Sequence, residues 1–259
     1  MQHATTTVFV MLLALAGLIL HAIFAARAGK SLFIRRIPGL SAIEEAVGRA
    51  AEMGKPMLFA TGLSGFDIDG LQALAVCGHV ARIAARYATR LILTVADAQL
   101  YAIGEEMMRD AYQRAGRPEL FQAEDVRFLS DQQFTFASAA AGIMYRENVA
   151  SNFFFGYYYA EALILSEAGQ SIGAMQVAGT PATTQLPFFI VSCDYTIMAE
   201  EYYATTAYLT REPTLLGSVI GQDRGKILLL CLIIIGTIML TLAPQAATVQ
   251  QIINWFPKP

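Results

Sequence analysis

Two long segments without a charged residue lie near the two ends of this 259-residue chain and restrict what it can fold into. The first covers residues 6–26, where His21 is the one titratable group, and the second covers residues 227–246. Each segment is long enough to cross a bilayer as a helix. We therefore expect two transmembrane helices, joined by an interior of about 180 residues that suits one folded domain.

A cleaved signal peptide is the alternative interpretation of the first segment. Residues 26–28, Ala-Arg-Ala, resemble the small-residue cleavage site of such a peptide. No Lys or Arg precedes the apolar run, however, and a signal peptide normally has a basic region there. This difference favours a retained transmembrane helix.

Basic residues flank the two segments on the side of the interior, and they include Arg35, Arg36, Arg224 and Lys226. Because short cytoplasmic loops are enriched in Lys and Arg, this distribution predicts a cytoplasmic domain and places both termini outside, including the tail 247–259. Basic residues beside a membrane also attract anionic lipids. We expect these four side chains to contact lipid head groups.

Composition excludes several classes of protein. The formal net charge is −3, which gives no indication of nucleic-acid binding. The three cysteines, Cys77, Cys193 and Cys231, agree with a reducing compartment and suggest neither a disulfide framework nor a metal site. We expect no metal and no cofactor.

Helix boundaries are well marked in the interior. Residues 41–44 form a capping box, so a helix is expected to begin at Ser41 and to end at Gly54, which can adopt a left-handed cap. Asp67 and Asp69 are alternative N-cap candidates for a second helix, and Ser130 is a candidate for a third. The residues before the first helix, 31–40, are interpreted as a linker.

Short apolar runs alternate with these helices at 57–61, 91–96, 126–129, 152–156, 173–178 and 188–192. Several of them are continuously apolar, as expected of strands covered by helices on both faces. The alternation predicts a doubly wound α/β domain with a mostly parallel sheet, over residues 41–215. A largely helical domain, in which these runs are the ends of buried helices, is the alternative.

Open parallel sheets bind ligands at the carboxyl ends of their strands, near the point where the strand order reverses. Four residues follow predicted strands and are candidates for such a cleft: Thr61, Asp97, Thr180 and Asp194. The alternative is structural, because Asp residues at these places also cap the next helix.

No catalytic set is assembled by the sequence. Residues 62–65, Gly-Leu-Ser-Gly, come nearest to a phosphate loop but match neither the dinucleotide fingerprint nor the P-loop. Cys193 is expected between a strand and a helix, a position that can activate a thiol, and His79 is the one interior histidine that could serve as its base. Zinc-binding and hydrolase motifs are missing.

Several strings resemble those of an uncharacterised prokaryotic two-span membrane-protein family, a domain of unknown function. The strings are residues 36–40 with 44–49, then 178–189, and then 211–223. The resemblance covers about residues 32–226. It implies the cytoplasmic membrane and two spans around a cytoplasmic domain, and it implies no catalytic residues.

These observations lead to two hypotheses from different classes. The first is a non-catalytic, membrane-anchored scaffold or subunit of a larger membrane assembly that self-associates through its cytoplasmic domain, because residues 153–159 and 195–208 are rich in the aromatic residues favoured at interfaces. Its partners would be membrane lipids and further copies or other membrane proteins. Packing in the core of the domain is the alternative explanation of these aromatic residues. The second is a small-ligand sensor or enzyme that uses the strand-end cleft.

Overall fold

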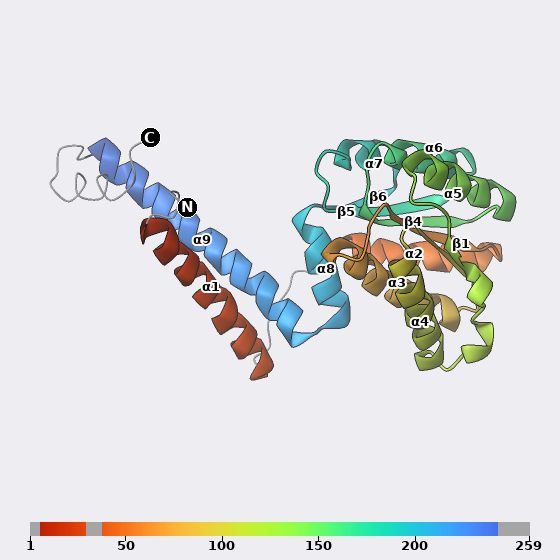
Figure 1. Ribbon diagram of the computed structural model, residues 1–259, viewed down its shortest axis with the longest axis horizontal. Helices are drawn as coiled ribbons and strands as arrows, with labels where there is room; N and C mark the ends of the chain where they lie inside the picture. Colours follow the sequence, from red (N-terminus) through yellow and green to blue (C-terminus); the bar gives the residue numbers. More distant parts are fainter. Residues whose placement is uncertain (1–5, 30–37, 243–259) are drawn as a thin grey trace. The chain divides into compact units, whose positions relative to one another are not determined.

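The computed structural model describes residues 6–29 and 38–242, and the chain divides into two units. One unit contains helices α1 (Thr6–Arg27) and α9 (Pro213–Leu242). The other contains residues 35–210 and is an α/β unit (Figure 1).

Six strands form one sheet in the α/β unit: β1 (Met57–Gly62), β2 (Leu91–Val95), β3 (Val126–Phe128), β4 (Ser151–Tyr157), β5 (Met175–Thr180) and β6 (Tyr195–Met198). They lie in the order β3-β2-β1-β4-β5-β6, and every neighbouring pair is parallel. This is the strand order of doubly wound dinucleotide-binding folds, with the reversal between β1 and β4. The predicted α/β class is confirmed, and the alternative of a largely helical domain is wrong.

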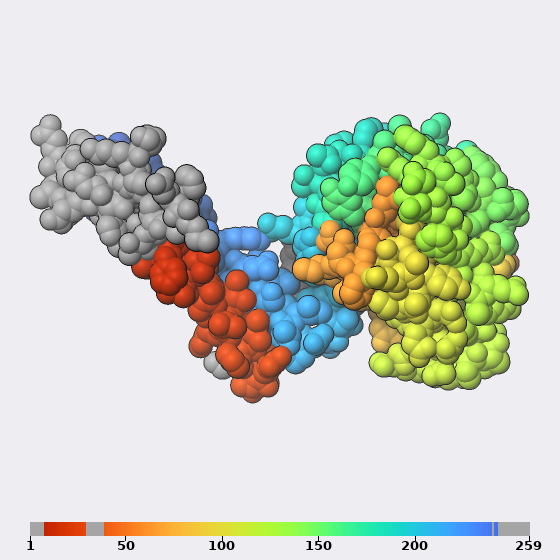
Figure 2. Space-filling view, in the orientation of Figure 1, coloured from red at the N-terminus to blue at the C-terminus, as the bar shows by residue number. Residues whose placement is uncertain are grey.

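Helices cover both faces of this sheet (Figure 1). The helices are α2 (Pro38–Met53), α3 (Ile68–Arg86), α4 (Ala98–Arg114), α5 (Gln133–Glu147), α6 (Glu161–Ser171), α7 (Leu186–Ser192) and α8 (Glu200–Thr210). Two short 3-10 turns, Pro118–Leu120 and Ala123–Asp125, lead into β3. In the space-filling view, the helices coloured orange to green make up much of the visible surface of the unit (Figure 2).

The core has one layer on each side of the sheet. Phe153 and Phe155 of β4 pack in the cluster that contains α2, α3 and α4, whereas Phe154 points to the opposite cluster, with α5, α6 and α7. All three phenylalanines are fully buried. Burial on both faces explains why β4 reads as a continuous apolar run, as parallel strands do when helices cover the sheet.

The sixth predicted strand is wrong. Residues 188–192 belong to α7, and the strand at this edge is β6, which follows Cys193. Pro187 occupies the first turn of α7, and burial of Phe189 beside exposed Ile190 and Val191 shows a helix with one covered face. A short apolar run does not distinguish a strand from a helix by its composition.

The predicted helix boundaries are partly confirmed. Helix α2 ends at Met53, before Gly54 with φ of +61°, as expected, but it begins at Pro38 rather than Ser41. Pro is well placed in a first turn, because the N–H that it lacks has no partner there. The predicted linker 31–40 therefore ends earlier than expected, and its residues 31–37 lie outside the described part of the chain.

The other two predicted caps have different outcomes. Asp67 is the N-cap of α3, and its carboxylate accepts a hydrogen bond of 2.8 Å from the N–H of Gly70. Ser130 does not cap a helix: α5 begins at Gln133, and the Ser130 hydroxyl accepts from the N–H of Gln132 in the preceding turn.

Among the residues that the structure describes, one helical segment, Val8–Arg27, is long and apolar enough to cross a membrane. This finding agrees with the first predicted span. Of the second predicted span, 227–246, residues 227–242 continue helix α9 and the others lie outside the described residues. The second span stays a prediction.

Helices α1 and α9 pack closely through three glycines of α9 at four-residue spacing: Gly217, Gly221 and Gly225. A Cβ atom on Gly217 would lie 2.5 Å from the Cα of Ile23, and one on Gly221 would lie 2.7 Å from the Cα of Ile19. Small residues at this spacing let two helix backbones approach each other, a packing mode common in membranes. The glycines thus fix the contact within this helical pair.

Candidate functional site at the carboxyl edge of the sheet

Three of the four predicted cleft residues lie at the carboxyl ends of strands. Thr61 is the second-last residue of β1, Thr180 is the last residue of β5, and Asp97 lies between β2 and α4. Asp194 is at the opposite edge, because it precedes β6 instead of following a strand. Its carboxylate accepts from the N–H of Gln176, near the start of β5, at 2.7 Å. The prediction that Asp194 joins the other three is therefore wrong.

Local structure already uses the polar groups of the other three residues. The buried Thr61 hydroxyl donates to the carbonyl of Thr94 at 3.4 Å, and the buried Thr180 hydroxyl accepts from the N–H of Ala182 at 3.1 Å. Asp97 caps α4 by accepting from the N–H groups of Gln99 and Leu100, both at 2.9 Å. These contacts are those of capping and tight turns.

The crevice between β1 and β4, where folds of this strand order bind ligands, is filled by the protein itself. The Ser64 hydroxyl accepts a hydrogen bond of 2.7 Å from the N–H of Tyr157, and the N–H of Leu63 donates to the carbonyl of Tyr157 at 3.0 Å. Fully buried Tyr158 donates its hydroxyl to the carbonyl of Ala60 at 2.6 Å. These bonds tie the loop after β1 to the end of β4.

The first turn of α3 is also unsuited to an anion. In dinucleotide-binding folds, the N-terminus of the helix after β1 receives the pyrophosphate. Here Asp67 occupies that N-terminus as the cap, and Asp69 adds a second carboxylate in the first turn. The Asp69 carboxylate accepts from the hydroxyl of Tyr203 at 2.8 Å. Two negative charges at this position repel phosphate.

The sequence did not single out a buried acidic residue at this edge. Glu161, at the start of α6, is fully buried and accepts hydrogen bonds from the N–H of Tyr159 at 2.9 Å and from Nε2 of Gln133 at 2.7 Å. These contacts join the starts of α5 and α6. The sequence feature that could have identified Glu161 is its position in the first turn of a helix, where acidic residues are favourable.

Large apolar side chains are exposed around the filled crevice. They are Phe66 (57% exposed), Ile68 (69%), Phe134 (61%) and Tyr159 (48%). The four come from the segments that follow β1, β3 and β4, so the parallel sheet brings them to one edge. Large apolar groups exposed at one edge of a protein are typical of interaction sites.

The same edge is acidic. The described segments that follow the strands, 61–71, 95–100, 128–134, 156–162, 180–186 and 198–206, contain no Lys or Arg. Their acidic residues are Asp67, Asp69, Asp97, Asp131, Glu161, Glu200 and Glu201. We call the four exposed apolar residues together with Asp67, Asp69, Asp97 and Asp131 the acidic edge surface. It is the candidate functional site.

The predicted thiol nucleophile is not activated. Cys193 follows the end of α7 instead of opening a helix, and burial raises the pKa of its thiol to about 12. His79 is on α3, and the pKa of its imidazole falls to about 4 because of burial first, and then because of the charges of Arg82 and Arg86. The thiol therefore stays protonated near pH 7, and an imidazole with so low a pKa is a weak base, so the two groups do not supply an activated nucleophile.

We predict that His79 makes the stability of the α/β unit depend on pH. An unfolded His binds a proton below pH about 6.5, whereas the folded imidazole resists protonation until about pH 4, so stability is lost as the pH falls through that window. In thermal melts of the full chain in detergent between pH 4 and 8, His79→Gln should reduce this loss by on the order of 2 kcal/mol. An identical pH dependence of variant and wild type would contradict the prediction.

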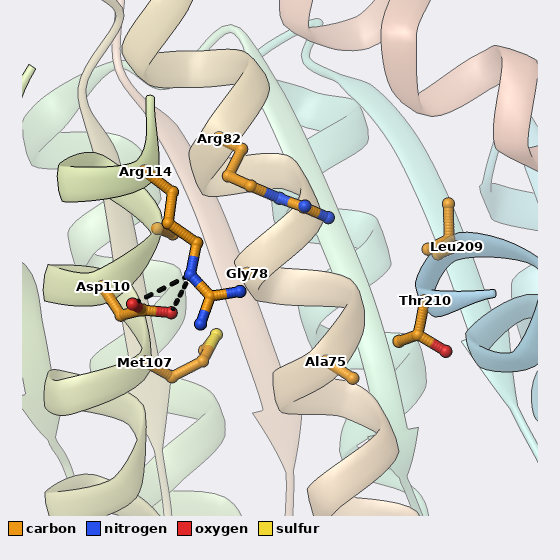
Figure 3. Close-up of a pocket in the computed structure, with 9 residues that line it drawn as sticks. Ala75, Gly78, Arg82, Met107, Asp110, Arg114, Leu209 and Thr210 are labelled. Atoms are coloured by element: carbon orange, nitrogen blue, oxygen red, sulfur yellow. Dashed lines mark hydrogen bonds and ion pairs between the residues drawn. The ribbon is translucent and has the colours of Figure 1, made fainter. Parts of the chain in front are cut away.

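A small groove of about 230 Å³ lies on the outer side of α3 and α4 (Figure 3). Arg82 reaches toward it from α3, while Arg114 of α4 turns to Asp110 and pairs with its carboxylate at 2.9 Å. Leu209 and Thr210, at the end of α8, complete the wall. Arg114 is 70% exposed, so its ion pair is a solvated surface contact of small energy.

The predicted lipid-contacting residues are partly within the described chain. Arg224 and Lys226 lie in α9 and are exposed, and Nζ of Lys226 lies 3.6 Å from the carboxylate of Asp223. Arg35 and Arg36 lie outside the described residues, as does the tail 247–259. Contact of these residues with lipid stays a prediction.

The chain is thus an α/β protein with a fully parallel six-stranded sheet, a filled strand-end crevice and an apolar helix of membrane-spanning length. It belongs to the family described as Domain of unknown function (DUF6754), which matches residues 1–253. The resemblance to a domain of unknown function is confirmed to that extent. No curated protein and no solved structure matches this chain significantly.

Proposed function

We propose that the protein is a non-catalytic, membrane-anchored scaffold whose α/β domain self-associates within a larger membrane assembly. The observation that carries the proposal is the acidic edge surface, where Phe66, Ile68, Phe134 and Tyr159 are exposed at the same edge as carboxylates such as that of Asp131. Exposed aromatic and aliphatic groups of this size stabilise protein contacts when they are buried.

The filled crevice supports this proposal over a sensor or enzyme. A ligand at the strand reversal would have to displace the hydrogen bonds of Ser64 with Tyr157 and of Tyr158 with Ala60. Breaking such buried bonds costs about 1–3 kcal/mol each when the groups are left without partners. A contact with a flat protein surface requires no such opening.

The membrane arrangement belongs to the same proposal. Helix α1 and the apolar residues 227–246 would both cross the cytoplasmic membrane of a prokaryote, with the α/β domain in the cytoplasm and both termini outside. The length and composition of α1 and the closely packed glycines of α9 support this arrangement. The basic residues Arg35, Arg36, Arg224 and Lys226 would then face the cytoplasmic lipid head groups.

The proposal predicts a particle larger than one chain and its detergent. We expect native mass spectrometry of the full chain, purified from its membrane in mild detergent, to give a homo-oligomer or a defined complex with other membrane proteins. Cross-linking in intact membranes is the control for subunits that are lost from the assembly in detergent. Detection of single protomers by both measurements would overturn the proposal, and a stoichiometric small molecule on such a protomer would favour the sensor or enzyme.

A further inference from the structure

The groove beside α3 and α4 contains an arginine without an acidic partner. Arg82 is half-buried and extends from α3 toward this groove of about 230 Å³ (Figure 3). Within the described residues, its one hydrogen bond runs from Nη2 to Nδ1 of His79 at 3.3 Å, and no carboxylate lies within ion-pair distance. A guanidinium that is partly withdrawn from water is stabilised by an anion. Arg82 is therefore suited to bind one.

His79 holds this guanidinium in place. Burial first, and then the charges of Arg82 and Arg86, lower the pKa of the imidazole to about 4. The ring is neutral near pH 7 as a result, and its Nδ1 can accept the hydrogen bond from Arg82 while Nε2 carries the proton. The contact fixes where the charge of Arg82 lies.

The α4 side of the groove supplies a second guanidinium. Nε of Arg114 pairs with the carboxylate of Asp110 at 2.9 Å, which leaves its two Nη atoms for another acceptor (Figure 3). The small residues Ala75, Gly78 and Ala111 line the groove and leave space between the two helices. An anion there can contact side chains of both α3 and α4.

Positive charge prevails in this part of the surface. Among the residues that line the groove, Arg82 and Arg114 are basic and Asp110 is acidic, so one positive charge remains. The charges that shift the pKa of His79, those of Arg82 and Arg86, are also both positive. Residues 211–212, Arg-Glu, follow the end of α8 in the sequence and cancel each other.

We propose that this groove binds a phosphomonoester between Arg82 of α3 and Arg114 of α4. Such a group carries a charge of about −1.5 to −2 near pH 7 and offers three acceptor oxygens, and the planar fork of a guanidinium matches two of them. The groove is smaller than the roughly 300–1,000 Å³ of pockets for larger molecules, so a phosphate with a short attached group fits better than a nucleotide.

The phosphomonoester can belong to a soluble molecule or to the head group of phosphatidic acid in the membrane. Both offer the same oxygens to the two arginines. This site goes beyond the proposed self-association and does not depend on it.

Calorimetric titration of the full chain with inorganic phosphate, in mild detergent and at constant ionic strength, tests the site. Arg82→Gln keeps much of the side chain and removes the charge, so it should weaken binding roughly tenfold or more. Arg146→Gln is the matched control, because it removes one positive charge from an exposed position on α5. This control should keep the wild-type affinity.

Asp110→Asn tests the site in the opposite direction. It removes the one carboxylate among the described residues that line the groove, so phosphate should bind several-fold more tightly. A merely structural role of the two arginines would not produce this gain. Melting curves check that each variant is folded, and Asp110→Asn loses only a solvated surface pair, so it tests the site even if Arg82→Gln does not fold.

A second titration, with dihexanoyl phosphatidic acid in the same detergent, separates the two sources. Tighter binding of this lipid than of phosphate would support a membrane lipid as the ligand, and equal binding would support a soluble phosphomonoester. Failure of both probes to bind the wild type, equal weakening by Arg82→Gln and Arg146→Gln, or no gain in Asp110→Asn would overturn the site. The mass of the assembly is a separate measurement, so such a failure is distinguishable from failure of the proposed function.

Discussion

Gly156→Ala is expected to lower the free energy of unfolding of the α/β unit by about 3 kcal/mol or more. Gly156 has φ of +139°, which L residues rarely adopt. A Cβ atom there would collide with the carbonyl oxygen of Thr61 and lie 2.5 Å from the Ser64 hydroxyl. Because those atoms close the crevice between β1 and β4, the strand and the loop would have to separate. Thermal melting of the full chain in detergent measures the loss.

Gly65→Ala is the matched control for this substitution. Gly65 lies in the same loop, but its Cβ would meet nothing within 4 Å, so a change of less than about 1 kcal/mol is expected. Equal losses in Gly65→Ala and Gly156→Ala would show that the loop is generally sensitive and would contradict the close approach at Gly156.

The second large effect is expected for Tyr158→Ala, which should cost about 3–5 kcal/mol. The ring is fully buried and packs edge-on against Phe189, with 5.1 Å between the ring centroids. Its removal leaves a cavity at the strand reversal and deprives the carbonyl of Ala60 of its 2.6 Å hydrogen bond. Urea unfolding of the full chain, followed by far-UV circular dichroism, would report the loss.

Two further substitutions separate the contributions of Tyr158. Tyr158→Phe keeps the ring and removes the hydroxyl, so we expect a smaller cost of about 1–2 kcal/mol. Tyr159→Ala changes the next residue, which is 48% exposed, and should cost less than about 1 kcal/mol. If Tyr158→Phe were as damaging as Tyr158→Ala, the hydrogen bond rather than the packing would close the crevice.

The sequence predicted most of the sheet because the signals were local. Continuous apolar runs marked the first five strands within two residues at each end, and Gly54 and Asp67 marked a helix end and a helix start. Such signals arise from backbone conformation and capping, which neighbouring residues decide. Residues 188–192 were misassigned because a short apolar run fits both a strand and a helix. Which of the two forms depends on whether the neighbouring elements bury the run on one side or on both.

The candidate site was predicted less well. Thr61, Asp97 and Thr180 were placed at the correct edge, but the sequence could not show that their polar groups are used in capping and turns. Asp194 was placed at the wrong edge, because the strand before it was misassigned. The acidic edge surface was missed, since its residues come from separate loops and only the strand order brings them together.

By itself, the sequence determined the class of the chain: an α/β domain between two apolar segments, with helix ends marked by Gly, Pro and Asp. Composition and short-range periodicity suffice for that, because they act through neighbouring residues. The tertiary structure decided how the space at the carboxyl ends of the strands is occupied. The approach of Gly156 to Thr61, and of Tyr158 to Ala60, joins residues nearly one hundred positions apart and fills the crevice. Packing between distant segments is a property of the folded chain that no local pattern contains.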